Sequence, residues 1–475
     1  MNGLFSNPAL LILISTLSFI FAAATEPTRL QLIFSCLSMC AINECKSVRF
    51  MHQHFHSSLS KRSLSSLYAV FNEAKIDLSS WFTNFCELLV EHIPKNLAEY
   101  PIFLVIDDTL IEKVGRHFEA WAKLFDHASH NGTNYLNGHC IVTLVVLFPV
   151  YDDNGSVKYV RVPLKHKLWI PKKQIEKYAE TNSESIVPGI PYRSKYDIVC
   201  QILEDALRAL GQDNSYIILA DSWYPKGEIL DFINNHDNVE AVFNVQINTA
   251  MYNVKIPEAT GKRGRPREIG DRISPRTDFT MVDIPGAGYR AGWRSVTTNL
   301  FGKKKPVRAL VTESKETKSR RLFICTNPEK CTIPVECITD KTVKAIIEAI
   351  PDALCFGCYS FRWAIEITYL EQKTHWSLSE YMLRSVTGIE RLINLQLMVY
   401  AVLCILPWID PAFKSLANLS IQERRYMIGK AINQDLFFRN FAAELKNIEN
   451  SEDLMKVFSE VAAKIRCFAK SGTED

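Results

Sequence analysis

Short apolar runs rich in β-branched residues stand out in the middle of the chain. They cover 102–106, 140–150 and 216–220, and each ends at a polar or turn-forming residue. Runs of this length and composition are typical of strands that are buried on both faces. The pattern therefore predicts at least three buried strands between residues 100 and 220.

Turn and helix signals connect these predicted strands. An Asp-Asp-Asn-Gly turn at 152–155 predicts a hairpin, with its second strand at 159–162. Residues 195–210 have helical spacing, and Gly211 ends the predicted helix. The order strand, strand, strand, helix, strand indicates an α/β core around a mixed sheet.

The flanking segments have other patterns. Residues 1–95 have helical spacing with a serine-rich break, and helical spacing returns near Lys341. Residues 235–345 are rich in short strands and turns, which indicates a β-rich insertion into the core. We expect an N-terminal helical domain at 1–95 with a possible role in DNA binding, core segments at 96–234 and 346–405, and a helical C-terminal region at 406–475.

An apolar run at 10–24 imitates a signal peptide. No Lys or Arg precedes it, so the positive segment of a signal peptide is missing, and Ser15, Thr16 and Ser18 interrupt it. The run is also short for a transmembrane helix. We interpret it as a buried helix, and expect a cytoplasmic protein without a membrane partner; secretion or membrane insertion is the alternative.

Positive charge is concentrated in the predicted insertion. The whole chain carries a net charge of +3, whereas 255–330 alone holds 18 Lys/Arg against 8 Asp/Glu. A basic segment beside a more acidic core favours a polyanionic partner. Within it, Lys-Arg-Gly-Arg-Pro-Arg at 262–267 is suited to the minor groove of DNA, which makes Arg263, Arg265 and Arg267 candidate DNA contacts; a solvated basic loop is the alternative.

The 13 cysteines are an odd number and are scattered through apolar runs. This indicates buried thiols in a reducing compartment rather than a disulfide framework. Cys355 and Cys358 form a CxxC without a second pair at zinc-finger spacing, so we interpret them as packed thiols.

Aspartates follow two of the predicted strands. Asp107 and Asp108 come directly after the run 102–106, and Asp221 follows 216–220. The carboxyl edge of strands is the usual ligand-facing position of an α/β sheet. One such aspartate is often only a turn residue, but two carboxylates meeting there are suited to hold Mg²⁺.

A charged stripe marks a predicted helix at 359–383, which contains neither Gly nor Pro. At about 100° per residue, Tyr359, Arg362, Glu366 and Lys373 fall on one side of it. A solvated stripe with an Arg–Glu pair at i, i+4 is the simplest interpretation when these residues are considered alone.

The four residues match a longer pattern. Their spacing is Y-x2-R-x3-E-x6-K without a departure, and this resembles the signature of bacterial insertion-sequence transposases of the DDE class. Ile-Asp-Asp-Thr at 106–109 resembles the first catalytic motif of that family, and Leu-Ala-Asp-Ser at 219–222 resembles the second. The resemblance covers about 95–405.

The resemblance implies a ribonuclease-H-like catalytic core, interrupted by the β-rich insertion. It implies Asp107, Asp221 and Glu366 as ligands of two Mg²⁺ or Mn²⁺ ions, with Asp108 as the alternative to Asp107. Tyr359, Arg362 and Lys373 would bind phosphates of the transposon end. The implied reaction is cleavage at transposon ends and strand transfer into target DNA by in-line displacement, and joining two ends implies a homodimer on DNA.

Other functions stay open at this point. A catalytically inactive DNA-binding protein derived from a transposase would keep the basic segment but show no metal-dependent cleavage. A stand-alone two-metal nuclease would cut DNA without strand transfer. Short inverted repeats in the DNA flanking the gene would identify the transposase activity and its substrate.

Overall fold

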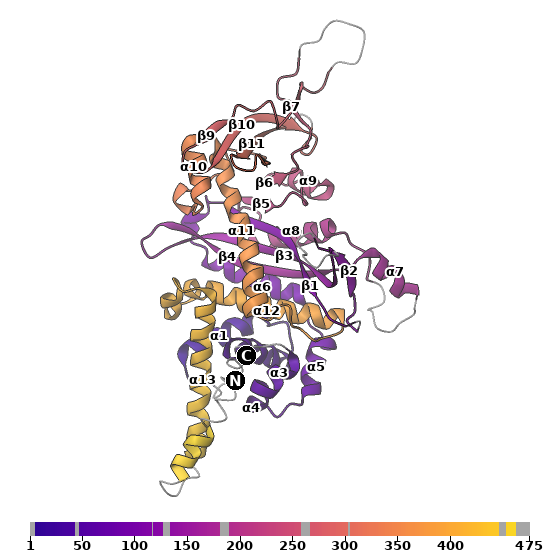
Figure 1. Cartoon of the computed structure of the whole chain (residues 1–475). Helices are drawn as coiled ribbons and strands as arrows, with labels where there is room; N and C mark the ends of the chain where they lie inside the picture. Colours follow the sequence, from indigo (N-terminus) through magenta and orange to yellow (C-terminus); the bar gives the residue numbers. More distant parts are fainter. Residues whose placement is uncertain are drawn as a thin grey trace.

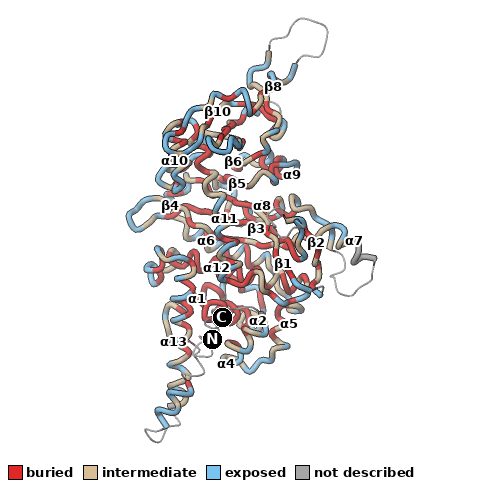
Figure 2. The backbone as a smooth tube through the Cα atoms, in the orientation of Figure 1, coloured by how far each residue is buried: buried red, intermediate tan, exposed pale blue. Residues whose placement is uncertain are grey.

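The computed structural model describes residues 5–42, 47–115, 117–126, 134–180, 190–257, 267–302, 305–445 and 453–461. The molecule is elongated, with helices at one end, a large sheet in the middle and a strand-rich extension at the other end (Figure 1). Buried residues concentrate in the sheet and in the helices that cover it (Figure 2). Helix α13 (Ile421–Leu445) runs outward from this body.

Helices fill the first part of the chain. The side chain of Asn7 caps α1 (Pro8–Ile20) by accepting a hydrogen bond from the N–H of Ala9 at 3.0 Å. Leu13 and Leu17 of α1 are fully buried, so the N-terminal apolar run forms a packed helix. The other elements of this part are α2 (Glu26–Ala41), α3 (Val48–Met51), η1 (His52–His56), α4 (Ser57–Leu59), α5 (Leu64–Asn72), α6 (Leu78–His92) and η2 (Lys95–Leu97).

Five strands in the order β4-β3-β1-β5-β6 form the centre of the sheet. β1 (Ile102–Glu112) pairs in antiparallel fashion with β3 (Tyr135–Tyr151), and β3 pairs in the same way with β4 (Val157–Trp169). β5 (Tyr216–Ala220) lies parallel to β1, and β6 (Val239–Val245) lies parallel to β5. The predicted mixed α/β architecture is confirmed.

Helices cover both faces of this sheet. They are α8 (Lys195–Leu210), α9 (Gly227–Asn234), α10 (Lys341–Ala349), the 3-10 helix η4 (Pro351–Arg362), α11 (Trp363–His375) and α12 (Val386–Ile409). α8 has the predicted bounds and ends at Gly211, whose φ is 105°. Outside the strand-rich extension, the remaining elements are β2 (Ala122–Phe125), α7 (Lys172–Glu180), η3 (Val335–Cys337) and η5 (Pro411–Leu416).

Alternate side chains of β1 enter two separate hydrophobic cores, as the two-residue period of a strand requires. Leu104 and Ile106 pack with residues of α8, and we call this side of the sheet the α8 face. Phe103 and Val105 pack with residues of η4 and α11, and we call this side the α11 face. Neighbouring residues of β1 therefore lie in different surroundings.

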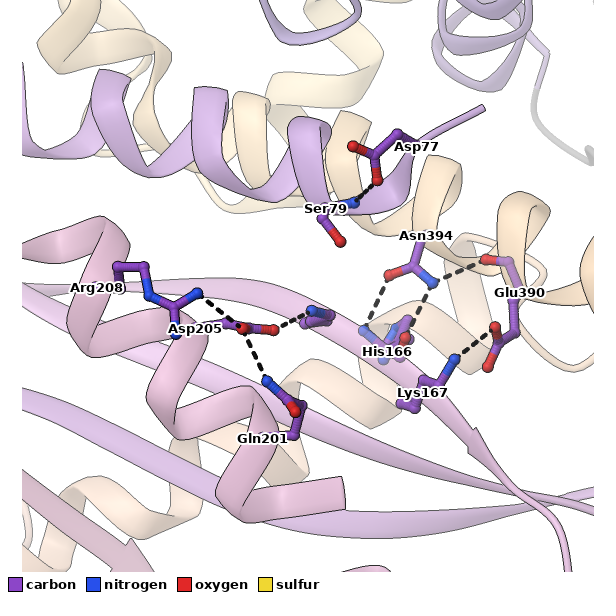
Figure 3. A network of polar contacts seen from close by, with 10 residues as sticks. Asp77, Ser79, His166, Lys167, Gln201, Asp205, Arg208, Glu390 and Asn394 are labelled. Carbon is purple, nitrogen blue, oxygen red and sulfur yellow. Dashed lines mark hydrogen bonds and ion pairs between the residues drawn. The ribbon is translucent and has the colours of Figure 1, made fainter. Parts of the chain in front are cut away.

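α12 is fastened to β4 by paired polar contacts. The side chain of Asn394 accepts from the N–H of His166 at 3.1 Å and donates to its carbonyl at 2.9 Å. Glu390 forms an ion pair with Lys167 at 2.9 Å (Figure 3). α12 is the one helix among the described residues that is long and apolar enough to cross a membrane, and 89% of its apolar window is buried inside the protein.

The sheet continues beyond β6 without a break. The added strands are β12 (Arg320–Cys325), β11 (Pro306–Ser314), β10 (Tyr289–Thr298), β7 (Met251–Asn253) and β8 (Arg272–Ile273), with β9 (Val282–Ile284) paired to β10. β6 falls inside the segment 235–345 that the sequence marks as an insertion. Its parallel pairing with β5 makes it part of the central sheet, so the antiparallel extension begins after Val245.

β1 does not end where its apolar run ends, contrary to our prediction. Its pairing with β3 continues to Glu112, and Asp107 lies opposite Thr143. Its parallel pairing with β5 stops at Val105, which lies opposite Leu219. Asp107 therefore lies inside a strand, at the point where the parallel neighbour of that strand ends.

The helix predicted at 359–383 is wrong in its extent. α11 covers only Trp363–His375, and Tyr359 and Arg362 belong to the preceding 3-10 helix. A 3-10 helix has about 3.0 residues per turn, so the α-helical angle used for Tyr359 does not apply. The chain leaves the helix after Trp376, since Ser377 has a φ of 57°, and becomes helical again at α12.

Candidate active site

Asp107 and Asp221 lie at the same edge of the sheet. Val105 of β1 pairs with Leu219 of β5, and the parallel register continued by two residues places Asp107 beside Asp221. Leu219 packs in the core of the α11 face, so Asp221, two residues further on, belongs to the same side. Two carboxylates from separate strands thus meet on the α11 face.

The surroundings of Asp107 disfavour its ionised form. Burial, and after it the charge of Asp221, raises the pKa of Asp107 to about 7, while the guanidinium of Arg362 acts in the opposite direction. Both oxygens of Asp107 accept hydrogen bonds: Oδ1 from the N–H of Asp108 at 2.8 Å, and Oδ2 from Nη1 of Arg362 at 3.1 Å.

Arg362 links Asp107 to Glu366. Its Nη2 donates to Oε1 of Glu366 at 3.0 Å, in the first turn of α11. The side chain of Arg362 is 14% exposed, and that of Glu366 is 38% exposed. One guanidinium therefore bridges two carboxylates that are far apart in the sequence, and a third carboxylate, Asp221, lies beside the first.

Asp108 points to the other side of β1. On the α8 face it accepts from Nζ of Lys195 at 2.7 Å and from the hydroxyl of Tyr224 at 2.6 Å. The thiol of Cys140 donates to it at 3.2 Å. The carboxylate of Asp108 is thus charge-paired and enclosed, and none of its contacts involves the α11 face.

Tyr359 and Lys373 border the carboxylates without contacting them. The hydroxyl of Tyr359 donates to the carbonyl of Ala220 at 3.4 Å, and burial raises the pKa of Tyr359 to about 12, so the phenol keeps its proton. Nζ of Lys373 donates to Oγ1 of Thr109 at 2.7 Å. All four residues of the Y-x2-R-x3-E-x6-K pattern therefore lie around the middle of β1 and the end of β5.

A hollow of about 770 Å³ opens beside this group. Asp221, Tyr359 and Arg362 line one part of it, and side chains of β11, β12 and α10 line the rest. Many of the lining groups are hydroxyls, such as those of Thr312 and Ser314. The hollow joins the carboxylates to the extension of the sheet.

A hydrogen-bonded group of polar residues surrounds Asp107 on the α11 face, and sequence reasoning missed it. The hydroxyl of Tyr369 donates to the carbonyl of Asp107 at 2.9 Å. Thr143, opposite Asp107 on β3, bonds to Nδ1 of His166 at 2.7 Å, and Nε2 of His166 bonds to Gln372 of α11 at 3.0 Å. Tyr369 lies one helical turn after Glu366, and this spacing was the one signal in the sequence.

The basic segment 262–267 lies mostly outside the described residues. Arg263 and Arg265 fall in the undescribed part, and Arg267 is exposed on the extension, where it pairs with Asp271 at 3.0 Å. Trp293 of β10 is half-buried, with the guanidinium of Arg308 at 4.6 Å from its ring centre. The structure thus brings none of the described basic residues of this segment to the carboxylates.

Asp107, Asp221 and Glu366 offer hard oxygen donors, which suit Mg²⁺ or Mn²⁺. In this structure the guanidinium of Arg362 lies between two of them. Over the described ranges, no three His, Cys, Asp or Glu side chains are already grouped closely enough to hold an ion.

Cys355 and Cys358 are buried in the core of the α11 face together with Cys325 and Cys331.

A family model described as DDE superfamily endonuclease matches residues 21–300, more than half of the chain. The chain therefore belongs to the DDE superfamily endonucleases, a family of nucleases that act on DNA and generally use divalent metal ions. The match includes Asp107 and Asp221 and ends before Glu366. A search of curated proteins gave no match.

Proposed function

We propose that this DDE endonuclease is a DNA transposase that cuts the ends of a mobile element and joins them to target DNA. The observation that carries the proposal is that Asp107 lies beside Asp221 where β5 ends and shares the guanidinium of Arg362 with Glu366. Tyr359 and Lys373 border this group. The pattern of acid and basic residues suits a phosphodiester: the acids would hold cations, and the bases would hold phosphates.

The topology supports a ribonuclease-H-like core. Three antiparallel strands are followed by two that run parallel to the first, and α8 and α9 make the connections. The strands β7 to β12 lie in the sequence between the core strand β6 and α11, as an insertion before the last acid would. We propose that 96–234 and 346–405 make up the core with β6, between helical end domains at 1–95 and 406–475.

We assign the metal ligand on β1 to Asp107 rather than to Asp108. Asp107 lies on the same face as Asp221 and shares a guanidinium with Glu366, whereas Asp108 is paired with Lys195 on the α8 face. Asp108 is turned away from Asp221 and Glu366, so it is not placed to share an ion with them. The ordinary two-residue alternation of the strand separates the two roles.

The residues of the site would have different roles in an in-line displacement at the phosphodiester. Two Mg²⁺ or Mn²⁺ ions would stabilise the attacking and leaving oxygens. Arg362 can hold a phosphate through two N–H groups, and Lys373 acts as a point charge. Tyr359, which keeps its proton, can donate to a phosphate oxygen. The end of the DNA strand would lie in the hollow beside Asp221. A homodimer would bring the two transposon ends together, and we place this reaction in the cytoplasm.

The proposal is tested with duplex DNA that carries the inverted repeats flanking the gene. We expect Mg²⁺- or Mn²⁺-dependent nicking at the repeat end, followed by strand-transfer products with a target plasmid. Glu366→Gln should abolish both products while the variant still binds the duplex in a gel-shift assay, because binding does not need the third acid.

Two outcomes would count against transposition. Cleavage without strand-transfer products would identify a stand-alone nuclease instead. Duplex binding without cleavage by the unaltered protein, at any divalent ion concentration, would indicate an inactive DNA-binding protein.

A further inference from the structure

The guanidinium of Arg362 occupies the position between two proposed metal ligands. It donates to Oδ2 of Asp107 at 3.1 Å and to Oε1 of Glu366 at 3.0 Å. The remaining oxygen of Asp107 accepts from the N–H of Asp108 at 2.8 Å. Arg362 thus engages one oxygen of each of the two carboxylates that would hold the ion.

A divalent ion and Arg362 cannot share this position. A guanidinium keeps its charge at all accessible pH values, and two cations a few ångströms apart in a partly buried site repel each other strongly. The Arg362 side chain is only 14% exposed, so solvent screens this repulsion weakly. Metal binding therefore requires the guanidinium to move off the carboxylates.

Arg362 also borders an open space. Arg362 lies at the end of η4 and lines the hollow that begins at Asp221. A DNA phosphate in this hollow would offer two acceptor oxygens on one group to the guanidinium. A phosphate thus competes with the carboxylates for the same N–H groups.

We propose that Arg362 is an internal counter-cation that closes the metal site until a DNA phosphate draws it away, so that DNA and metal bind cooperatively. This inference rests on the proposed function, since it takes Asp107 and Glu366 as ligands. Cooperativity follows by linkage: the factor by which DNA raises metal affinity equals the factor by which metal raises DNA affinity. Because of this cooperativity, the enzyme would bind little metal when free and would bind metal once DNA is bound.

The test measures metal binding rather than activity. Free Mn²⁺ is followed by electron paramagnetic resonance during titration of the whole protein, with and without a short blunt duplex. For the unaltered protein we expect weak Mn²⁺ binding that the duplex strengthens on the order of tenfold. For Arg362→Gln we expect tight Mn²⁺ binding without the duplex and no further gain with it.

Three variants give the matched comparisons. Arg161→Gln removes a different Arg–Glu pair, in which Arg161 of β4 contacts Glu371 of α11 at 2.6 Å, and should leave Mn²⁺ affinity unchanged. Arg362→Lys keeps the charge but reaches only one carboxylate, so its affinity should lie between those of the unaltered protein and Arg362→Gln. If Arg362→Gln fails to fold, the Mn²⁺ affinity of Arg362→Lys tests the inference instead. Asp221→Asn removes a ligand that Arg362 does not contact, and should weaken Mn²⁺ binding in every background.

The outcomes separate the inference from the proposed function. If Asp221→Asn weakens Mn²⁺ binding but Arg362→Gln and Arg362→Lys match the unaltered protein, the counter-cation role is overturned and the metal site stands. If Asp221→Asn has no effect on Mn²⁺ binding, the metal site itself is wrong, and the proposed function falls with it.

Discussion

Asp107 and Asp108 are neighbours on β1, but they lie in opposite electrostatic surroundings. On the α8 face, Asp108 is matched by the ammonium of Lys195 and by the hydroxyl of Tyr224. On the α11 face, Asp107 and Glu366 share one guanidinium, and Asp221 adds a further negative charge. An excess of carboxylates at the end of a strand marks a place for cations, whereas a matched carboxylate marks a structural contact.

The largest expected contrast between the two faces is catalytic. Asp107→Asn should reduce DNA cleavage at least about a thousandfold, because a lost metal ligand removes several kcal/mol of transition-state stabilisation. Asp108→Asn should reduce cleavage by only about tenfold, the lower end of the effect of a group that adjoins a metal ligand without contacting the ion. Single-turnover cleavage of a labelled duplex measures both rates.

Circular dichroism at the assay temperature serves as the control for folding in this pair. Since both variants replace one carboxylate by an amide of the same shape, a difference in rate reports position and not residue type. The opposite result, in which Asp108→Asn is the inactive variant although it is folded, would move the metal ligand to the α8 face and overturn our assignment.

The sequence could predict the features of this comparison that depend on local pattern. Apolar runs predicted β3, β5 and the start of β1, and a helical pattern followed by Gly211 predicted the bounds of α8. The alternation of β1 was also present in the sequence, since Asp107 continues the series Phe103, Val105. That series became informative only once the structure placed Asp221 on the α11 face, the side of the sheet on which Phe103 and Val105 pack.

Tertiary contacts decided what the sequence could not predict. β1 continues past Ile106 because β3 pairs with it as far as Glu112, although its own apolar run has ended. The chain around Tyr359 forms a 3-10 helix packed in the core of the α11 face, where α-helical spacing had seemed continuous. The contact of Arg362 with Asp107 joins segments 255 residues apart, which no local pattern can show.

The second contrast concerns stability. The change in the free energy of unfolding should have opposite signs for the substitutions on the two faces. Asp108→Asn should lower the free energy of unfolding by about 2–3 kcal/mol at pH 8, because it leaves the largely buried ammonium of Lys195 without its partner. Asp107→Asn should raise it by about 1 kcal/mol, because it removes a carboxylate that resists ionisation. Urea unfolding followed by tryptophan fluorescence measures both changes.

The pH dependence of the Asp107→Asn gain checks its cause. The pKa of Asp107 lies at about 7 in the folded protein, against an ordinary value of 3.8, so its ionisation destabilises the fold increasingly as pH rises between these values. The advantage of Asp107→Asn should therefore grow from pH 5 to pH 8 and then stay constant. A gain of the same size at pH 5 and pH 8 would show that burial of this carboxylate is not its cause.

The smallest contrast concerns two lysines on the opposite faces. Lys373 lies beside Thr109 on the α11 face, where we place the DNA, whereas Lys195 is engaged by Asp108 on the α8 face. Lys373→Gln should weaken duplex binding a few-fold and lower the slope of log affinity against log salt by about 1, the value for one lost phosphate contact. Lys195→Gln should leave that slope unchanged, even though it destabilises the fold. Fluorescence anisotropy over a series of salt concentrations gives both slopes, and equal slopes for the two variants would mean that DNA does not distinguish the faces of β1.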